Sequence, residues 1–422
     1  MLDINFIRDS PDIVREAIRK KQRDAAVVDK VLGLDEKRRE LLQRIEDLRA
    51  ERNRISKTVR QSDSQTVERG REIKEELKKL EPELKEIEKQ LNNALLQIPN
   101  PPAPDVPEGK DESENVEVKI WGKLPQFDFK PRAHDELGKL LDVIDTERAA
   151  KVSGARFGYL KNEAVLMEFG LINLAFRTLV KEGFVPVIPP VMIKLDSMRG
   201  MGYLEHGGAD NMFILEKDDL VLVGTSEQSL GPMHLNEVLD EKTLPRRYVG
   251  FSTCFRREAG SYGKDTRGIL RVHQFDKVEM FSFTKPEDGD AEHEFLLSME
   301  EKLMQALKLP YQVTKMCTGD LGDPAARKYD VNAWFPSENC YRETHSTSTC
   351  TDYQARRLNI KYRKKDGTTE FVHTLNGTAF SQRPILAILE NYQQKDGSVV
   401  VPEVLRDLVG KDVITPKTTL RS

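Results

Sequence analysis

The chain has 422 residues, which is long for one compact domain and predicts two or three. Charged residues make up 32% and hydrophobic residues 38%, and the formal net charge of −4 argues against a uniformly basic nucleic-acid binder. A local basic stripe would still be enough to contact phosphates. No run of about 18 apolar residues occurs, so no transmembrane helix is expected, and the N-terminus lacks the features of a secretory signal.

The cysteines indicate the compartment. They are few, widely spaced and without a CxxC pair, which fits a reducing cytoplasm and argues against a cysteine-based zinc site. The seven histidines are scattered, and none belongs to a zincin motif. We therefore expect a cytoplasmic protein with no structural metal. The cysteines are Cys254, Cys317, Cys340 and Cys350.

Two heptad repeats lie near the N-terminus. In residues 34–59 and again in residues 73–98, apolar side chains recur at alternating spacings of four and three, with Arg38 and Arg52 as interruptions. This spacing is typical of the seam of a coiled coil and is sustained for about four heptads in each run. Each run therefore predicts a long helix, and Pro82 is expected to bend the second one.

The polar segment 61–70 between the runs ends in glycine and predicts a turn. Two heptad helices joined by a short turn fold back on each other, so we expect an antiparallel hairpin over about 28–98, preceded by a helical lead-in. Residues 52–60 carry four basic side chains and no acidic one, which gives one end of the hairpin a basic patch. These side chains are Arg52, Arg54, Lys57 and Arg60.

The rest of the chain has a mixed pattern. Five prolines within residues 99–107 exclude a helix or a central strand there and predict a stiff linker over 99–115. Beyond it, residues 135–183 have a helical pattern, and short β-like runs then alternate with helical ones, including a hairpin signal at 365–367. Strands next to strands indicate an antiparallel α+β domain over 116–422.

The most informative segment is F-S-T-C-F-R-R-E-A-G-S-Y-G-K-D-T-R-G-I-L-R-V-H-Q-F-D-K-V-E-M-F, residues 251–281. Its β-type ends flank a basic, loop-forming centre, which predicts strand, loop and strand. Arg256 offers a planar fork to a carboxylate or phosphate, and Glu258, two residues on and so on the same strand face, is an acceptor. Phe275 offers a ring face to a base, and Arg271 offers positive charge. Taken singly, Arg256 and Glu258 could form a surface ion pair, and Phe275 could belong to the core.

This ordered block resembles motif 2 of class II aminoacyl-tRNA synthetases and is closely similar to the seryl-tRNA synthetase version. The preceding long helix and the segment VPVIPPVMI (185–193) resemble motif 1, the dimer-forming element, with Pro190 in its proline position. TLNGTAFSQRPILAILENYQ (374–393) resembles motif 3, although a Gly-Thr turn is also an ordinary helix start. Residues 329–363 resemble the seryl family's E-x-S-S-x-S…D-F-Q-A-R-R stretch, part of which is equally a strand with a hydroxyl-rich face.

The resemblance covers essentially the whole chain and implies its organisation. An N-terminal antiparallel coiled-coil arm (1–98) that binds tRNA would be followed by the linker and by a class II catalytic domain, an antiparallel β-sheet flanked by helices. Motif 1 implies a homodimer. For the arm, a protein–protein coiled coil is the alternative, since that is the commoner role of heptads.

The implied reaction is serine–tRNA ligation. ATP, with Mg²⁺, would activate L-serine to seryl-adenylate and release pyrophosphate, and serine would then pass to the 3′-terminal adenosine of tRNA(Ser), with tRNA(Sec) as a further candidate. The expected catalytic residues are Arg256, Arg271 and Arg383. The residues expected to bind serine are Thr225, Ser226, Glu227, Arg256, Glu279, Asn376 and Thr378. Those expected to bind ATP are Arg256, Arg257, Glu258, Arg271, Val272, Phe275, Glu343, Thr344, His345, Ser346 and Arg383. The expected Mg²⁺ ligands are Glu343 and Ser346, together with ATP.

Glu279 is expected to select serine. With Thr378 it would hold the serine hydroxyl, and an analogue without that hydroxyl would leave the charged acceptor buried and unpaired. Alanine should therefore be rejected without an editing domain. Taken alone, Glu279 is equally a surface residue on an alternating strand.

Some positions depart from the family pattern. His345 stands where serine is usual, Asn332 stands where glutamate is common, and residues 198–204 differ from M-x-G-T-G-x-L. None of these changes removes a residue with an expected chemical role. Two rival functions stay open: an amino acid:carrier-protein ligase, which would lack the arm and bind its amino acid through zinc, and a synthetase-like RNA-binding protein that has lost active-site residues.

Overall fold

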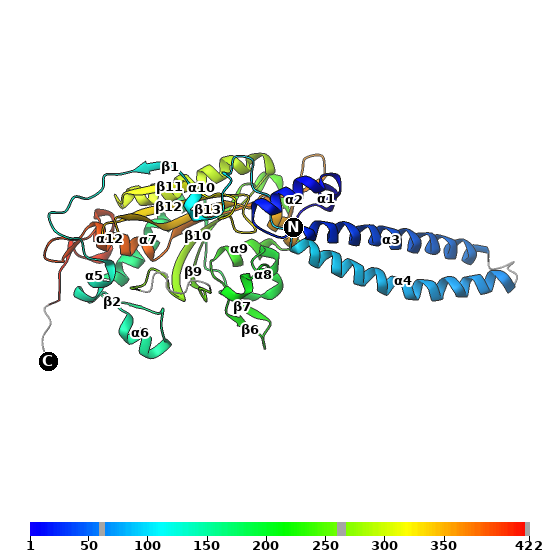
Figure 1. Ribbon diagram of the computed structural model, residues 1–422, viewed down its shortest axis with the longest axis horizontal. Helices are drawn as coiled ribbons and strands as arrows, with labels where there is room; N and C mark the ends of the chain where they lie inside the picture. The colour runs from blue at the N-terminus through cyan, green and yellow to red at the C-terminus, as the bar shows by residue number, and fades with distance from the viewer. Residues whose placement is uncertain (59–63, 260–266, 418–422) are drawn as a thin grey trace. The chain divides into compact units, whose positions relative to one another are not determined.

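The computed structural model describes residues 1–58, 64–259 and 267–417. It divides into two structural units, Met1–Pro101 and Pro102–Ser422 (Figure 1). Among the described residues, no helix combines the length and the apolar character that a membrane crossing requires.

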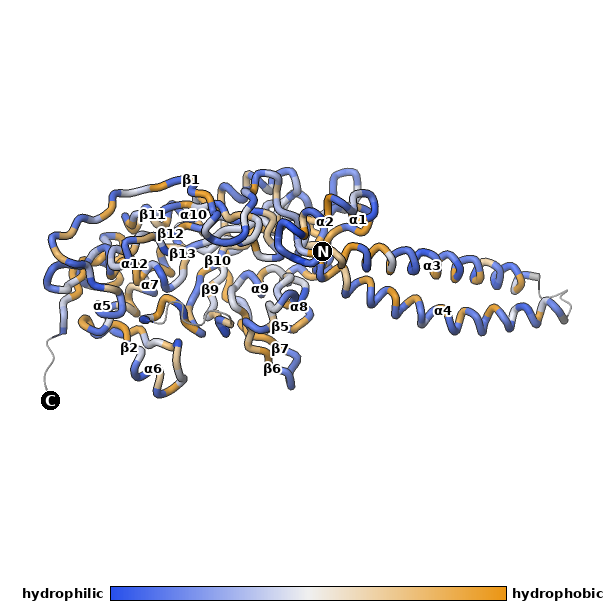
Figure 2. Tube along the Cα trace, in the orientation of Figure 1, coloured by the Kyte–Doolittle hydropathy of each residue, from blue (hydrophilic) through white to orange (hydrophobic). Residues whose placement is uncertain are grey.

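The first unit is entirely helical. Its long helices α3 and α4 lie side by side (Figure 1), and hydrophobic and hydrophilic residues alternate in short stretches along both (Figure 2). α4 begins earlier than the predicted turn 61–70 allows, since residues 64–70 are helical, and it continues through Pro82 without a break. Residues 61–63 lie outside the described part of the chain. The helices are α1 (Ile4–Asp9), α2 (Pro11–Lys20), α3 (Ala26–Thr58) and α4 (Ser64–Leu96).

The two long helices form the expected antiparallel hairpin. Four seam residues, Ile45, Leu48, Ile73 and Leu77, are buried against one another. Ion pairs cross between the helices in antiparallel order, because residues further along α3 pair with residues earlier in α4. They are Arg38–Glu88 at 3.3 Å, Arg44–Glu76 at 2.7 Å and Glu51–Arg69 at 2.8 Å. The heptad prediction of a coiled-coil hairpin is therefore confirmed.

The second unit is built on one large sheet, antiparallel except where β4 pairs with β9. Across the sheet the order is β1 (Val116–Trp121), β11 (Tyr311–Lys315), β12 (Arg327–Phe335), β13 (Cys340–Thr349), β16 (His373–Phe380), β10 (Gln274–Thr284), β9 (Arg246–Phe255) and β4 (Val185–Val187).

Helices and small sheets surround this large sheet (Figure 1). The helices are α5 (His134–Leu140), α6 (Thr146–Ser153), α7 (Glu163–Lys181), α8 (Leu195–Met201), α9 (Glu227–Leu230), α10 (Gly289–Ala306), α11 (Tyr353–Leu358), α12 (Arg383–Asn391) and α13 (Arg406–Val409). In one small sheet, β7 (Leu220–Leu222) lies between β5 (Met192–Lys194) and β6 (Ile214–Leu215), and in another β14 (Lys361–Arg363) lies between β15 (Thr369–Phe371) and β8 (Val238–Asp240). Two further sheets pair β2 (Ile144–Asp145) with β3 (Tyr159–Leu160) and β17 (Val399–Val400) with β18 (Val413–Ile414).

Strand β10 shows how the sheet separates core from site. Successive side chains of a strand point to opposite faces. Val278 and Met280 belong to the main hydrophobic core, which α7, α10 and α12 share, whereas Lys277 and Glu279 line a cleft on the other side. Because both faces of β10 are covered, Glu279 is not the surface residue that an alternating strand would allow.

Several sequence predictions can be compared with these elements. The hairpin at 365–367 is confirmed, since β14 and β15 are antiparallel and Gly367 has φ +87°. The helical pattern of 135–183 is broken into α5, α6 and α7 by two short strands. The proline-rich segment does not act as a free spacer. Its residues from Ala103 on pack on the second unit, and Asp105 lies 2.8 Å from both Arg327 and Lys315.

Candidate active site

A cleft of about 720 Å³ opens on the face of the large sheet opposite the main core. β10, β13 and β16 form its floor, residues within 255–259 and 269–272 form one wall, and the N-terminus of α12 closes one end. All but three of the residues predicted for serine, ATP and Mg²⁺ line it. They are Thr225, Glu227, Arg256, Glu258, Arg271, Val272, Phe275, Glu279, Glu343, Thr344, Ser346, Asn376, Thr378 and Arg383.

Arg256 and Phe275 form one wall together. The Nε of Arg256 donates to the carbonyl oxygen of Gly224 at 3.1 Å, and its guanidinium lies 5.1 Å from the ring centre of Phe275. The ring packs against the core and also lines the cleft, so the core interpretation holds and the binding of a base stays a prediction. A planar cation fixed on a ring in this way is held ready for an anionic ligand.

Glu258 is positioned differently from the prediction. Strand β9 ends at Phe255 and Glu258 has φ +51°, so it does not share a strand face with Arg256. Its Oε2 accepts from the Nη1 of Arg271 at 2.8 Å, so Glu258 forms an ion pair with Arg271 instead. A non-glycine residue in the left-handed region is uncommon, and such strain is concentrated at functional sites.

Three predicted residues lie outside the cleft lining. Ser226 is fully buried, and its hydroxyl lies 2.7 Å from that of Ser252. Arg257 points outward, where its Nε donates to Met212 and its guanidinium stacks on a neighbouring ring. His345 sits on β13 between Thr344 and Ser346, which line the cleft, so strand alternation directs its ring elsewhere. Burial lowers the pKa of His345 to about 4, so the ring is neutral.

The end of the cleft nearest β10 is acidic and buried. The Oε1 of Glu227 accepts hydrogen bonds from the Tyr203 hydroxyl at 2.7 Å and from the Asn376 amide at 3.0 Å, and burial raises its pKa. Glu279 lies opposite Thr378 in the pairing of β10 with β16 and is 1% exposed. Burial raises the pKa of Glu279 to about 7, against the charge of Lys277, which lowers it.

The opposite end contains two ion pairs. The Nη1 of Arg383 lies 2.9 Å from Glu343, and the Nζ of Lys328 lies 3.0 Å from Asp330. Burial would raise the pKa of Glu343, but the charges of Arg383 and Lys328 outweigh it and lower the pKa to about 2. This carboxylate is therefore ionised throughout the neutral range.

The donor set at this end fits Mg²⁺ that arrives with a phosphate ligand. Glu343 supplies an ionised carboxylate and Ser346 a hydroxyl, and oxygen ligands of this kind are the ones Mg²⁺ takes from proteins. Within the described residues, no cluster of three His, Cys, Asp or Glu side chains could hold a metal by itself. Phosphate oxygens would have to complete the coordination.

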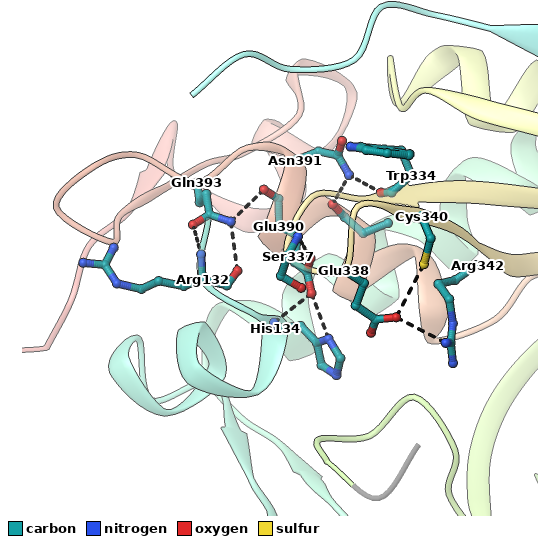
Figure 3. Close-up of polar contacts among 11 residues, drawn as sticks. Arg132, His134, Trp334, Ser337, Glu338, Cys340, Arg342, Glu390, Asn391 and Gln393 are labelled. Atoms are coloured by element: carbon teal, nitrogen blue, oxygen red, sulfur yellow. Dashed lines mark hydrogen bonds and ion pairs between the residues drawn. The ribbon is translucent and has the colours of Figure 1, made fainter. Parts of the chain in front are cut away.

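A buried polar network fixes the helix that carries Arg383 (Figure 3). Glu390, near the end of α12, accepts from the backbone N–H of His134 at 2.9 Å and of Ser337 at 3.1 Å, and the Nδ1 of His134 lies 3.0 Å away. The same imidazole packs on Gly268, where a Cβ would lie 2.4 Å from Nε2. The network thus ties α12 to the chain that returns from segment 260–266 toward Arg271.

Sequence reasoning missed several residues of the lining. Tyr203, Lys277 and Lys328 all face the cleft. Lys277 precedes Glu279 by two residues, so strand periodicity alone could have placed it beside Glu279. Tyr203 lies in segment 198–204, where the sequence showed a departure from the family pattern but did not indicate a residue of the site.

Comparison with family models identifies both units. Residues 1–102 match the model "Seryl-tRNA synthetase N-terminal domain", and residues 212–392 match "tRNA synthetase class II core domain (G, H, P, S and T)". A serine–tRNA ligase from Thermobifida fusca is 49% identical over 420 residues, covering 99% of each chain.

Solved structures show the same similarity. The seryl-tRNA synthetase of Pyrococcus horikoshii, crystallised in complex with ATP, has a TM-score of 0.94 and 41% identity over 99% of this chain and 100% of its own. A cytoplasmic serine–tRNA ligase of Naegleria fowleri, in complex with AMP, has a TM-score of 0.88 and 36% identity over 99% of each chain.

We predict that His345→Ser leaves ATP binding unchanged, because its ring does not line the cleft. Ser346→Ala, the next position along β13 and on the cleft side, is the matched variant and should weaken ATP binding. Calorimetric titration of the full-length protein with ATP and Mg²⁺ measures both. Equal weakening in the two variants would contradict this assignment of strand faces.

Proposed function

The chain belongs to the seryl-tRNA synthetase family. We propose which part of the serine–tRNA ligation reaction each residue of its cleft performs. As a serine–tRNA ligase, it activates serine with ATP and transfers it to tRNA. The observation that carries the proposal is that one cleft holds two buried carboxylates, Glu227 and Glu279, together with the guanidinium of Arg256, whose charge acts on both. An amino acid with its ammonium and hydroxyl at the acidic end would direct its carboxylate toward the cations.

The first step needs positioning more than proton transfer. The serine carboxylate attacks the α-phosphorus of ATP, and pyrophosphate leaves. A carboxylate is already ionised at pH 7, so no general base is required. Arg256 would bind the carboxylate and the α-phosphate, while Arg271 and Arg383 would neutralise the outer phosphates. The guanidinium of Arg256 is already stacked on Phe275, so little reorganisation accompanies binding.

The nucleotide would use the remaining groups of that half. Phe275 offers its ring to adenine, with Val272 beside it, and Glu258 would accept from the exocyclic amine. Glu343 and Ser346 would hold Mg²⁺ with the phosphates, where the ion supplies charge neutralisation. Thr344 lines the same floor.

Serine would be held at the acidic end. Thr225 and Glu227 are suited to the ammonium, and Glu279 with Thr378 to the hydroxyl, with Asn376 lining the site. In the second step the 3′-terminal hydroxyl of the tRNA attacks the seryl-adenylate carbonyl and AMP leaves. We propose tRNA(Ser) as the acceptor, with tRNA(Sec) as a further candidate.

We propose that the arm binds this tRNA. Arg52, Arg54 and Lys57 are exposed on the last two turns of α3 that the structure describes, and Arg60 lies outside the described residues. An exposed basic cluster on a chain of net charge −4 is suited to the phosphates of RNA.

We also propose a homodimer and a cytoplasmic location. β4 lies at an edge of the large sheet, and Val185, Ile188 and Met192 in the motif 1 segment are 53%, 83% and 50% exposed. Apolar side chains grouped at a sheet edge favour burial against another chain, and motif 1 points to a second copy. All four cysteines are free, which fits a reducing compartment.

Arg256→Ala is predicted to abolish serine-dependent ATP–pyrophosphate exchange, because removing one preorganised donor typically costs ~10²–10³ in rate. Arg257→Ala is the matched control: it removes the adjacent arginine, which points away from the cleft, and should retain most of the exchange. Near-normal exchange in Arg256→Ala would refute the mechanism.

The arm is tested by reversing the charge of Arg52, Arg54 and Lys57 to glutamate in the full-length protein. Serine-dependent exchange should persist, while the tRNA KM for aminoacylation should rise and its salt dependence become shallower, because fewer phosphate contacts release fewer counterions. The control reverses the exposed lysines Lys302, Lys308 and Lys395 of the second unit. Unimpaired charging in the arm variant would show that this patch does not bind the tRNA.

A further inference from the structure

Lys277 and Glu279 form a buried ion pair on the floor of the cleft. They lie two residues apart on β10, with side chains 9% and 1% exposed, and the Nζ of Lys277 is 2.5 Å from Oε2 of Glu279. The same Nζ donates to the Thr225 hydroxyl at 3.2 Å. Lys277 therefore joins the two groups that the proposed function places at the serine hydroxyl and at the serine ammonium.

Glu279 needs the positive charge of Lys277 to stay ionised, because other carboxyl groups surround it. The charge of Glu227, on α9, raises the pKa of Glu279, and the charge of Glu279 in turn raises the pKa of Glu300, a fully buried residue of α10. Closely placed carboxylates oppose one another's ionisation, and burial opposes it further. Burial raises the pKa of Glu300 well above its usual value, with the charge of Glu279 adding to the effect, so this second carboxyl is neutral.

The other groups around Glu279 have smaller effects on its pKa than Lys277 has. Arg256 lowers the pKa of Glu279, but Lys277 has the larger effect, and it is the cation in contact with the carboxylate. Burial raises the pKa of both Tyr203 and Cys254, so these neighbours are neutral at pH 7. The ionised state of Glu279 therefore depends chiefly on Lys277.

We propose that Lys277 is a specificity-determining residue of the serine pocket, which acts by keeping Glu279 an ionised hydrogen-bond acceptor. The inference rests on the proposed function of the cleft. An ionised carboxylate has no proton to donate and needs a donor from its ligand, whereas a protonated one carries its own O–H. A ligand without a hydroxyl gives the ionised carboxylate no donor beyond Lys277, which costs more than the same loss at a protonated carboxyl group. Lys277 would thus strengthen the discrimination of serine against alanine.

The pH dependence gives a signature that a purely structural role would not produce. The pKa of Glu279 is about 7, so in the unaltered protein serine binding should strengthen as the pH rises through 7 and the acceptor form is populated. Removing the lysine removes the largest attractive charge, so the pKa of Glu279 rises and the same strengthening moves to higher pH.

The experiment measures serine- and alanine-dependent ATP–pyrophosphate exchange by the full-length protein between pH 6 and 9. Because an opposite charge at contact distance shifts a carboxyl by about 1–3 units, Lys277→Met should raise the serine KM at pH 7 by ~10-fold or more. The ATP KM should stay unchanged, and the serine/alanine ratio of kcat/KM should fall. Lys277→Arg, which keeps the charge, should restore the profile in part.

Two further variants separate the possible outcomes. Lys277→Met/Glu279→Gln removes both charges and should bind serine weakly with no pH dependence near neutrality. Lys302→Met removes a lysine from a surface pair with Glu182, 2.7 Å long, and should change nothing. Should Lys277→Met fail to fold, Lys277→Gln carries the same expectation, since it keeps a donor but no charge.

An unchanged serine KM and pH profile after loss of the lysine would overturn the inference while leaving the ligase assignment intact. A loss of kcat for serine and alanine alike, with no shift of the pH profile, would also overturn it, because that result assigns Lys277 to the chemistry. Absence of serine-dependent exchange in the unaltered protein would instead refute the proposed function.

Discussion

The cleft depends on the register of strand β10 between β9 and β16. Antiparallel pairing sets Glu279 opposite Gly250 on one side and Thr378 on the other. A slip of one residue would turn every side chain of β10 to the other face, exposing Met280 to the cleft and burying two charges in the core. Burial of Val278 and Met280 in the core therefore fixes the register of β10, and this register directs Lys277 and Glu279 into the cleft.

The same constraint explains why the charges are distributed as they are. A buried charge is costly unless it is paired, and the cleft pairs its charges across different elements. Glu258 pairs with Arg271 across segment 260–266, Glu343 with Arg383 between β13 and α12, and Glu279 with Lys277 within β10. Both partners of each pair line the cleft, where a ligand of suitable charge would replace or extend the contact.

Much of this could be predicted from the sequence, and the exceptions have physical causes. Heptad spacing specifies an apolar seam, so it predicted the hairpin of α3 and α4. The ordered block 251–281 predicted which residues would gather at one site. It could not show that His345 points away from the cleft, because the family pattern names positions and not strand faces. The backbone at Glu258 was also beyond prediction, since its positive φ follows from the loop and not from the residue type.

The role of Lys277 could not be predicted from the sequence for a different reason. A lysine two residues before a glutamate on a predicted strand is an ordinary surface pattern. Its role becomes apparent only when the fold buries both side chains and adds the charge of Glu227, on α9, to the surroundings of Glu279.

All of the proposed residue roles depend on the activation of serine in this cleft. The most direct measurement is ATP–pyrophosphate exchange by the full-length protein with each of the twenty amino acids in turn. We expect exchange with serine and strong rejection of alanine, which lacks the hydroxyl that Glu279 is proposed to bind. Exchange with no amino acid, or exchange with alanine as efficient as with serine, would contradict it.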